Sequence, residues 1–77
     1  MTIIGEKLHK ARLIRGYSVK ELSQMSGIKE SLIVQYECEE SEPSNDEVFT
    51  FSVVLRFPIR FFTTPIKDEL EVKNTFF

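Results

Sequence analysis

The stretch from residue 18 to residue 37 constrains the fold more than any other part of the chain, because it marks where one helix starts and ends and where another begins. Ser18 and Glu21 have the spacing of a capping box, in which each side chain accepts a hydrogen bond from a backbone amide of the first helical turn. Gly27 can adopt the left-handed conformation that ends a helix. Apolar residues recur at helical spacing after that glycine, at Ile28, Ile33 and Tyr36. The stretch therefore predicts two short helices joined by a tight glycine turn.

A third helix is predicted before this pair. The apolar and small residues Ile4, Leu8 and Ala11 recur at helical spacing. Gly16 follows as a C-terminal stop signal, so the helix is expected within residues 4–15.

A fourth helix is predicted after a polar break. It begins at a cap, Ser44 or Asn45, and ends before Pro58, because proline disfavours helix in the residue that precedes it. Its apolar face consists of Val48, Phe51, Ser52 and Leu55. A further short helical turn is expected at residues 59–62.

The chain has 77 residues, which is enough for one small domain. We expect an all-α fold of four to five short helices in residues 1–65, followed by a C-terminal linker or tail in residues 66–77. The only cysteine, Cys38, cannot form an internal disulfide. Because no stretch has the pattern of a signal peptide or a membrane span, we expect a cytoplasmic protein without membrane contact.

Charge is divided unevenly along the chain. Residues 1–36 carry six lysines and arginines against three glutamates, whereas residues 37–77 carry four cations against nine carboxylates. The first half therefore suits a phosphate-bearing partner, and the second half would be repelled by one.

No pattern predicts catalysis. The sequence has no nucleophile and base pair, no phosphate-binding loop and no cluster of metal ligands, and His9 is its only histidine. We therefore expect no enzyme activity, no cofactor and no metal site.

Together these features resemble the Cro-type phage-repressor family of helix-turn-helix domains, also called the xenobiotic-response-element family. The resemblance covers residues 4 to about 62 and is carried by Ile4-Gly5, Leu8, Ala11-Arg12, Gly16-Tyr17-Ser18, Glu21-Leu22, Gly27-Ile28, Ile33, Tyr36-Glu37, Pro43-Ser44 and Leu55. It implies a lambda-repressor-like fold. It also implies a transcriptional regulator of phage or mobile-element type that binds double-stranded DNA as a dimer, with the third helix in the major groove.

The resemblance also assigns roles to individual residues. It implies that bases are contacted by Glu30, Ser31 and Gln35. It implies that phosphates are contacted by Lys20 and Lys29 and by the backbone amides that start the second helix, at Ser18 and Val19. Arg12 and Glu37 resemble the family's partly buried ion pair and are assigned to structure.

Two alternatives stay open. Residues 57–65, followed by Phe76 and Phe77, resemble the junction in regulators fused to ImmA/IrrE-type metallopeptidase domains, so the chain can also be a truncated regulatory domain of such an enzyme. The acidic segment at residues 37–42 instead favours an antirepressor-like protein-binding module that has lost DNA affinity.

Apolar residues are left over once the core is assigned. Phe49 and Val53 fall outside the apolar face of the fourth helix, and Phe61 and Phe62 add to the surplus. These four residues predict a surface for a homodimer, or for docking of another repressor or a peptidase domain.

Overall fold

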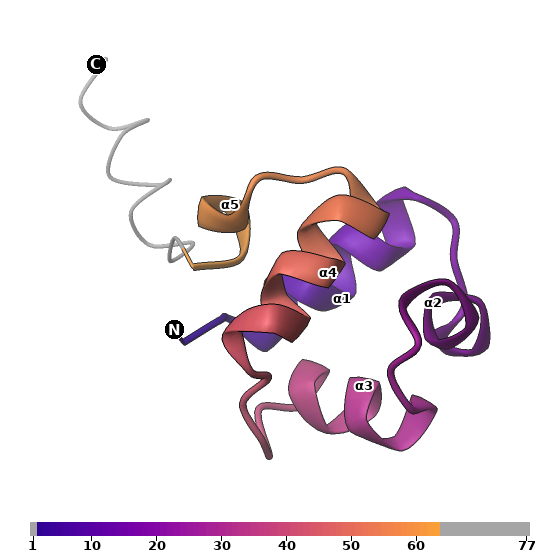
Figure 1. Cartoon of the computed structure of the whole chain (residues 1–77), viewed down its shortest axis with the longest axis horizontal. Coiled ribbons are helices and arrows are strands. Elements are labelled where there is room, and N and C mark those ends of the chain that lie inside the picture. The colour runs from indigo at the N-terminus through magenta and orange to yellow at the C-terminus, as the bar shows by residue number, and fades with distance from the viewer. Residues whose placement is uncertain (1, 64–77) are drawn as a thin grey trace.

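The computed structural model describes residues 2–63, which form five α-helices and no strand (Figure 1). The helices are α1 (Gly5–Ile14), α2 (Val19–Ser26), α3 (Glu30–Glu37), α4 (Asn45–Leu55) and α5 (Ile59–Thr63). The predicted all-α fold is therefore confirmed, whereas the tail predicted at residues 66–77 lies outside the described residues. None of the helices in residues 2–63 is long and apolar enough to cross a membrane.

Helices α2 and α3 form the pair that the sequence predicts. The Ser18 hydroxyl accepts a hydrogen bond from the Glu21 amide at 3.0 Å, and the Glu21 carboxylate accepts one from the Ser18 amide at 2.9 Å. Gly27 ends α2 in the left-handed conformation, with φ of 74°. The capping box and the glycine stop are thus both formed as predicted.

Helix α4 begins with a second capping box. The Ser44 hydroxyl accepts from the Glu47 amide at 3.2 Å, and the Glu47 carboxylate accepts from the Ser44 amide at 2.9 Å. The same Glu47 oxygen accepts a hydrogen bond from the Tyr36 hydroxyl at 2.9 Å. Glu47 therefore fixes the start of α4 and links it to α3.

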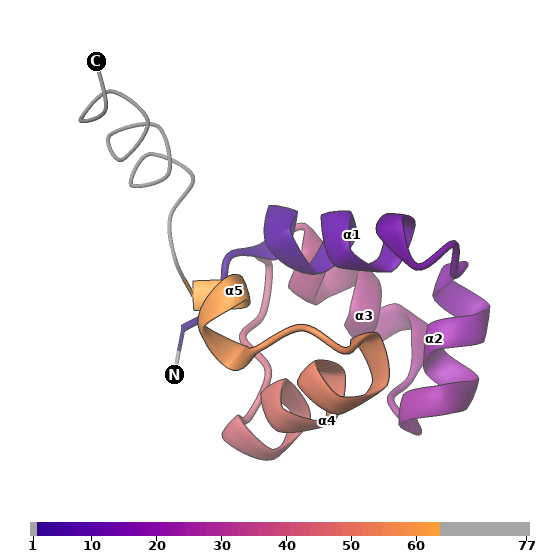
Figure 2. The same ribbon diagram turned by 90° about the horizontal axis from the view of Figure 1, so that it is seen from above.

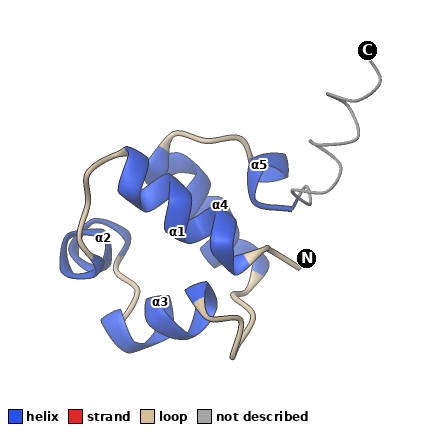
Figure 3. Ribbon diagram, turned by 180° about the vertical axis from the view of Figure 1, so that it is seen from behind, coloured by secondary structure: helices blue, strands red, loops and turns tan. Residues whose placement is uncertain are grey.

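The helices enclose a small apolar core. Figure 2 shows α1 and α4 on opposite sides of the molecule, and α3 lies below both in the views of Figures 1 and 3. The buried apolar side chains are Ile3, Leu8, Ala11, Leu22, Ile28, Ile33, Tyr36, Val48, Phe51, Leu55 and Phe62. This set confirms the predicted faces of the third and fourth helices, except that Ser52 is only half-buried.

The prediction that Phe62 lies on a partner surface is wrong. Its side chain is only 1% exposed and belongs to the core. Phe61 is half-buried. Its ring stacks on Phe57 with 4.4 Å between centroids and meets the Phe62 ring edge-on at 5.5 Å. Short α5 turns these rings inward, so only Phe49 and Val53 remain on the predicted surface.

Lys7 is buried, which the sequence did not indicate. Its side chain is 1% exposed, and Nζ lies 4.9 Å from the centroid of the Phe61 ring. The Ile4 amide nearby donates to the Phe62 carbonyl at 2.7 Å. The cation of Lys7 therefore supports the contact between α1 and α5 and is withdrawn from the surface.

Candidate nucleic-acid interface

The N-terminal end of α3 is open to solvent. Lys29, Glu30 and Ser31 are all exposed. Lys29 precedes α3 in an extended conformation and makes no side-chain capping hydrogen bond. The first amides of α3 therefore lack the side-chain cap that α2 and α4 have, and a helix N-terminus of this kind favours an anion.

Val34 extends this exposed face and was missed in the sequence analysis. It lies one helical turn beyond Glu30 and Ser31 and is also exposed. The signal was present in the sequence, since Val34 falls outside the apolar set of Ile33 and Tyr36.

Three of the predicted DNA-contacting residues are engaged within the protein. The amide and the hydroxyl of Ser18 are both engaged in the capping box of α2, and the Val19 side chain is half-buried against the core. Gln35 is half-buried towards the C-terminal end of α3, and its amide oxygen accepts a hydrogen bond from the Ser41 hydroxyl at 2.9 Å. Lys20 is exposed at the start of α2. The residues that the structure leaves open are thus Lys20, Lys29, Glu30 and Ser31, with Val34 added.

The other end of α3 is tied to α1 by Arg12 and Glu37. Nε of Arg12 donates to Oε2 of Glu37 at 2.8 Å, and Nη2 donates to Oε1 at 3.0 Å. Nη1 of Arg12 donates to the Tyr17 carbonyl at 3.0 Å. The side chains of Arg12 and Glu37 are 10% and 9% exposed. This two-point contact has the geometry in which arginine binds a carboxylate most strongly.

The pair shifts the pKa of both members. The hydrogen bond to Glu37 raises the pKa of Arg12 despite the opposing effect of burial. Burial by itself raises the pKa of Glu37, but hydrogen bonds from Arg12 and His9 outweigh it, and the net pKa lies below the usual value. Both side chains are therefore held in their charged forms.

His9 is a third member of this cluster that the sequence analysis did not include. Its Nδ1 lies 2.8 Å from Oε1 of Glu37 and 3.1 Å from Nη2 of Arg12. The bond to Glu37 needs a hydrogen on Nδ1, whereas the bond to Arg12 needs Nδ1 to accept, so one excludes the other. The available signal was position, because His9 lies one turn before Arg12 on α1.

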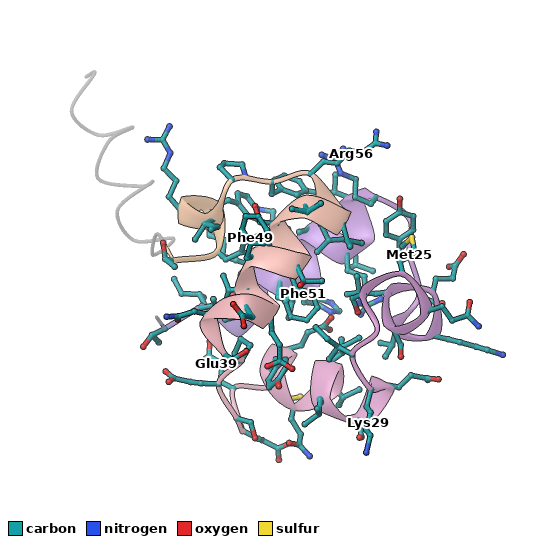
Figure 4. The ribbon with its side chains drawn as sticks, viewed as in Figure 1. Met25, Lys29, Glu39, Phe49, Phe51 and Arg56 are labelled. Carbon is teal, nitrogen blue, oxygen red and sulfur yellow. The ribbon has the colours of Figure 1, made fainter. Side chains whose placement is uncertain are left out.

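Part of the acidic segment at residues 37–42 is engaged in hydrogen bonds within the protein. Besides Glu37, the Glu39 carboxylate accepts a hydrogen bond from the Gly5 amide at 2.8 Å, which satisfies an amide of the first turn of α1. Glu40 and Glu42 are exposed. Figure 4 shows Glu39 and Lys29 beyond opposite ends of α3. The acidic segment therefore lies away from the open N-terminal end of α3.

Fewer lysines and arginines of residues 1–36 are available for contacts with phosphate than the charge of this half indicates. Besides Lys7 and Arg12, Arg15 is engaged internally, donating to the Leu55 carbonyl at 2.6 Å and lying 4.6 Å from the centroid of the Phe57 ring. The cations of residues 1–36 that are exposed without such a role are Lys10, Lys20 and Lys29. Among residues 2–63, no three His, Cys, Asp or Glu side chains are grouped to hold a metal ion.

Solved structures with the same arrangement of helices support this description. The restriction-modification controller protein C.AhdI from Aeromonas hydrophila is 23% identical, with a TM-score of 0.71 over 74% of this chain and 86% of that one. SinR, described as the master regulator for biofilm formation and solved in complex with DNA, is 27% identical, with a TM-score of 0.72 over 75% of this chain and 97% of that one.

A transcriptional regulator of the HTH_3 family from Vibrio cholerae is 25% identical, with a TM-score of 0.71, and this chain covers 33% of its length. A search of curated proteins found no match. Residues 8–62 match the sequence pattern of the family HTH_3, described as helix-turn-helix. The chain therefore belongs to the helix-turn-helix family HTH_3.

Proposed function

We propose that this protein is a DNA-binding transcriptional regulator that places the N-terminal end of α3 in the major groove of double-stranded DNA. The observation that carries the proposal is the exposed, uncapped start of α3, presented by the capped helix α2 and the left-handed turn at Gly27. The major groove of B-DNA is wide enough to admit an α-helix, and polar side chains at the N-terminal end of that helix can reach base edges.

The exposed residues suit the chemistry of base and phosphate contacts. The Glu30 carboxylate can accept from cytosine N4, and the Ser31 hydroxyl can donate or accept. Val34 offers an apolar contact for a thymine methyl group, while Lys20 and Lys29 are the cations available for phosphates. Gln35 has a smaller part in this proposal than its sequence position implied, because Ser41 occupies its amide oxygen.

The relatives favour the same function. SinR, at 27% identity, is described in complex with DNA, and the Vibrio cholerae protein is described as a transcriptional regulator. A phage or mobile-element origin rests on the residues that carry the Cro-type resemblance. The antirepressor alternative loses part of its support, because Glu37 and Glu39 are engaged within the protein.

Fluorescence anisotropy of a labelled random-sequence duplex tests this function. Because Lys20 and Lys29 are proposed to contact phosphates, we expect non-specific binding with Kd of about 10⁻⁴ to 10⁻⁶ M at physiological salt, tightening as salt is lowered. Lys29→Ala should weaken binding and reduce the slope of log K against log salt by about one.

Lys10→Ala is the matched control, because it removes the same charge from an exposed position on α1, outside helices α2 and α3. It should leave the salt slope unchanged. If no binding occurs even at low salt, the proposal fails and a protein partner becomes the better hypothesis. An equal loss of DNA affinity in the two variants would also contradict the proposal, since binding would then depend only on the net charge of the protein.

A further inference from the structure

The exposed face of α3 carries a carboxylate and an apolar side chain one helical turn apart. Glu30 is the first residue of α3 and is exposed, and the Val34 side chain is 46% exposed. Within residues 2–63 the Glu30 carboxylate forms no hydrogen bond or ion pair, whereas Glu21 and Glu47 close the capping boxes of α2 and α4. Figure 4 shows Lys29, the residue before Glu30, at the periphery of the molecule. The Glu30 carboxylate is therefore available to accept a hydrogen bond from a ligand.

Glu30 and Val34 are close enough to contact the same base. Residues four apart on a helix lie on one face, with about 5–6 Å between their Cβ atoms. A helical side chain also leans towards the N-terminal end of its helix, so Val34 covers the turn that begins at Glu30. The base that satisfies both side chains must present a hydrogen-bond donor with an apolar group beside it.

The base edges in the major groove differ in what lies beside their donors. In an A·T pair the N6 donor of adenine lies between two acceptors, adenine N7 and thymine O4, and both repel a carboxylate. The N4 donor of cytosine has an acceptor, guanine O6, on one side only, because the C5 atom of cytosine lies on the other side. Methylation at C5 places a methyl group directly beside this donor. In thymine the same methyl group lies beside the acceptor O4.

From this match we propose that Glu30 and Val34 together recognise 5-methylcytosine. The Glu30 carboxylate accepts a hydrogen bond from N4, and the Val34 side chain packs on the C5-methyl group. The inference rests on the proposed function, because it requires α3 in the major groove. It narrows that function to one ligand class, which is DNA methylated at C5 of cytosine, and methylation strengthens the binding.

Fluorescence anisotropy with three labelled duplexes of equal length tests the proposal. The first contains G·C pairs in scrambled order, the second has every cytosine of that sequence replaced by 5-methylcytosine, and the third contains only A·T pairs. Their phosphate charges are equal, so the bases make the difference. The wild-type chain should bind the methylated duplex about two- to fourfold more tightly than the unmethylated one, which is the gain from burying one methyl group. It should bind the A·T duplex most weakly.

Three variants assign the preference to its residues. Val34→Ser should bind the methylated and unmethylated duplexes equally. Leu13→Ser is the matched control, because it removes a similarly exposed apolar side chain from α1, and it should keep the preference for the methylated duplex. Glu30→Gln should favour the A·T duplex over the unmethylated G·C duplex, because glutamine pairs with adenine through N6 and N7. Circular dichroism of each variant checks that the helices are kept.

Several results would overturn the proposal. One is equal binding of the methylated and unmethylated duplexes by the wild-type chain. Another is an A·T duplex bound as tightly as the methylated one, which would assign Val34 to thymine methyl groups. A third is a loss of the methyl preference in Leu13→Ser as large as that in Val34→Ser. Each of these leaves the proposed DNA binding in place, whereas no binding to any of the three duplexes at low salt would overturn both proposals.

Discussion

The two ends of α3 differ in how their polar groups are used. At the N-terminal end, Lys29 makes no capping hydrogen bond and its neighbours Glu30 and Ser31 are exposed. At the C-terminal end, Glu37 binds Arg12 and His9, and Tyr36 donates to Glu47 of α4. One end is therefore fixed by α1 and α4, while the other is available to a partner. Whether a charged side chain is available to a partner therefore depends on its position in the fold more than on the number of charges nearby in the sequence.

The largest effect should come from breaking the fixed end with Arg12→Ala. The substitution leaves the Glu37 carboxylate largely buried without its main partner, which costs about 3–5 kcal/mol of unfolding free energy. Because a domain of this size gains or loses roughly 4–8 °C in Tm per kcal/mol, we expect a fall of more than about 10 °C. Thermal unfolding followed by circular dichroism measures it.

Lys10→Ala is the control on the same helix, and its exposed side chain should change the unfolding free energy by about 0.5 kcal/mol or less. A Tm for Arg12→Ala equal to that of the wild type would remove the structural role assigned to the ion pair.

A smaller effect is expected from Gly5→Ala, which tests the close approach of α1 to the same end of α3. A Cβ at Gly5 would lie 2.4 Å from the Glu37 carbonyl oxygen and 2.6 Å from that of Tyr36. Backbone atoms cannot yield as a flexible side chain does, so α1 must shift at a cost of about 1–3 kcal/mol. Urea unfolding should show the loss, and Glu6→Ala, at the exposed next position, should not. Equal midpoints for Gly5→Ala and wild type would show that α1 can move freely.

The third prediction concerns pH. Since the folded pKa of Glu37 lies below the unfolded value of about 4.3, the unfolded chain binds a proton first as pH falls. Its contribution to stability is therefore complete above about pH 5 and is lost as pH falls through the folded pKa. In urea midpoints measured across that range, Glu37→Gln should be less stable at neutral pH and less sensitive to acid. An acid dependence as steep as that of the wild type would assign the effect to other carboxylates.

The sequence predicts well what depends on neighbours along the chain. The Ser18–Glu21 capping box, the Gly27 stop and the apolar face of α4 all appear in the structure because spacing alone determines them. Ser44 and Glu47 have the same spacing and form the same box, although the sequence analysis predicts only a cap at Ser44 or Asn45.

Contacts between distant segments could not be predicted in this way. Glu39 meets the Gly5 amide 34 residues earlier in the sequence, and Arg15 reaches the Leu55 carbonyl 40 residues later. Neither partner is marked by a local pattern, because backbone groups are present at every position. The burial of Lys7 and Phe62 likewise depends on where α5 packs. These misses explain why charge counts overstated both the basic surface and the acidic one.

The proposed function requires that DNA contacts the N-terminal end of α3 and not its C-terminal end. This can be checked by titrating the ¹⁵N-labelled protein with a short random-sequence duplex at low salt and following each backbone amide by NMR. The amides of residues 29–31 and of Lys20 should shift together with added DNA, while those of residues 36–39 stay in place. Shifts confined to residues 36–39, or absent from both ends of α3, would contradict it.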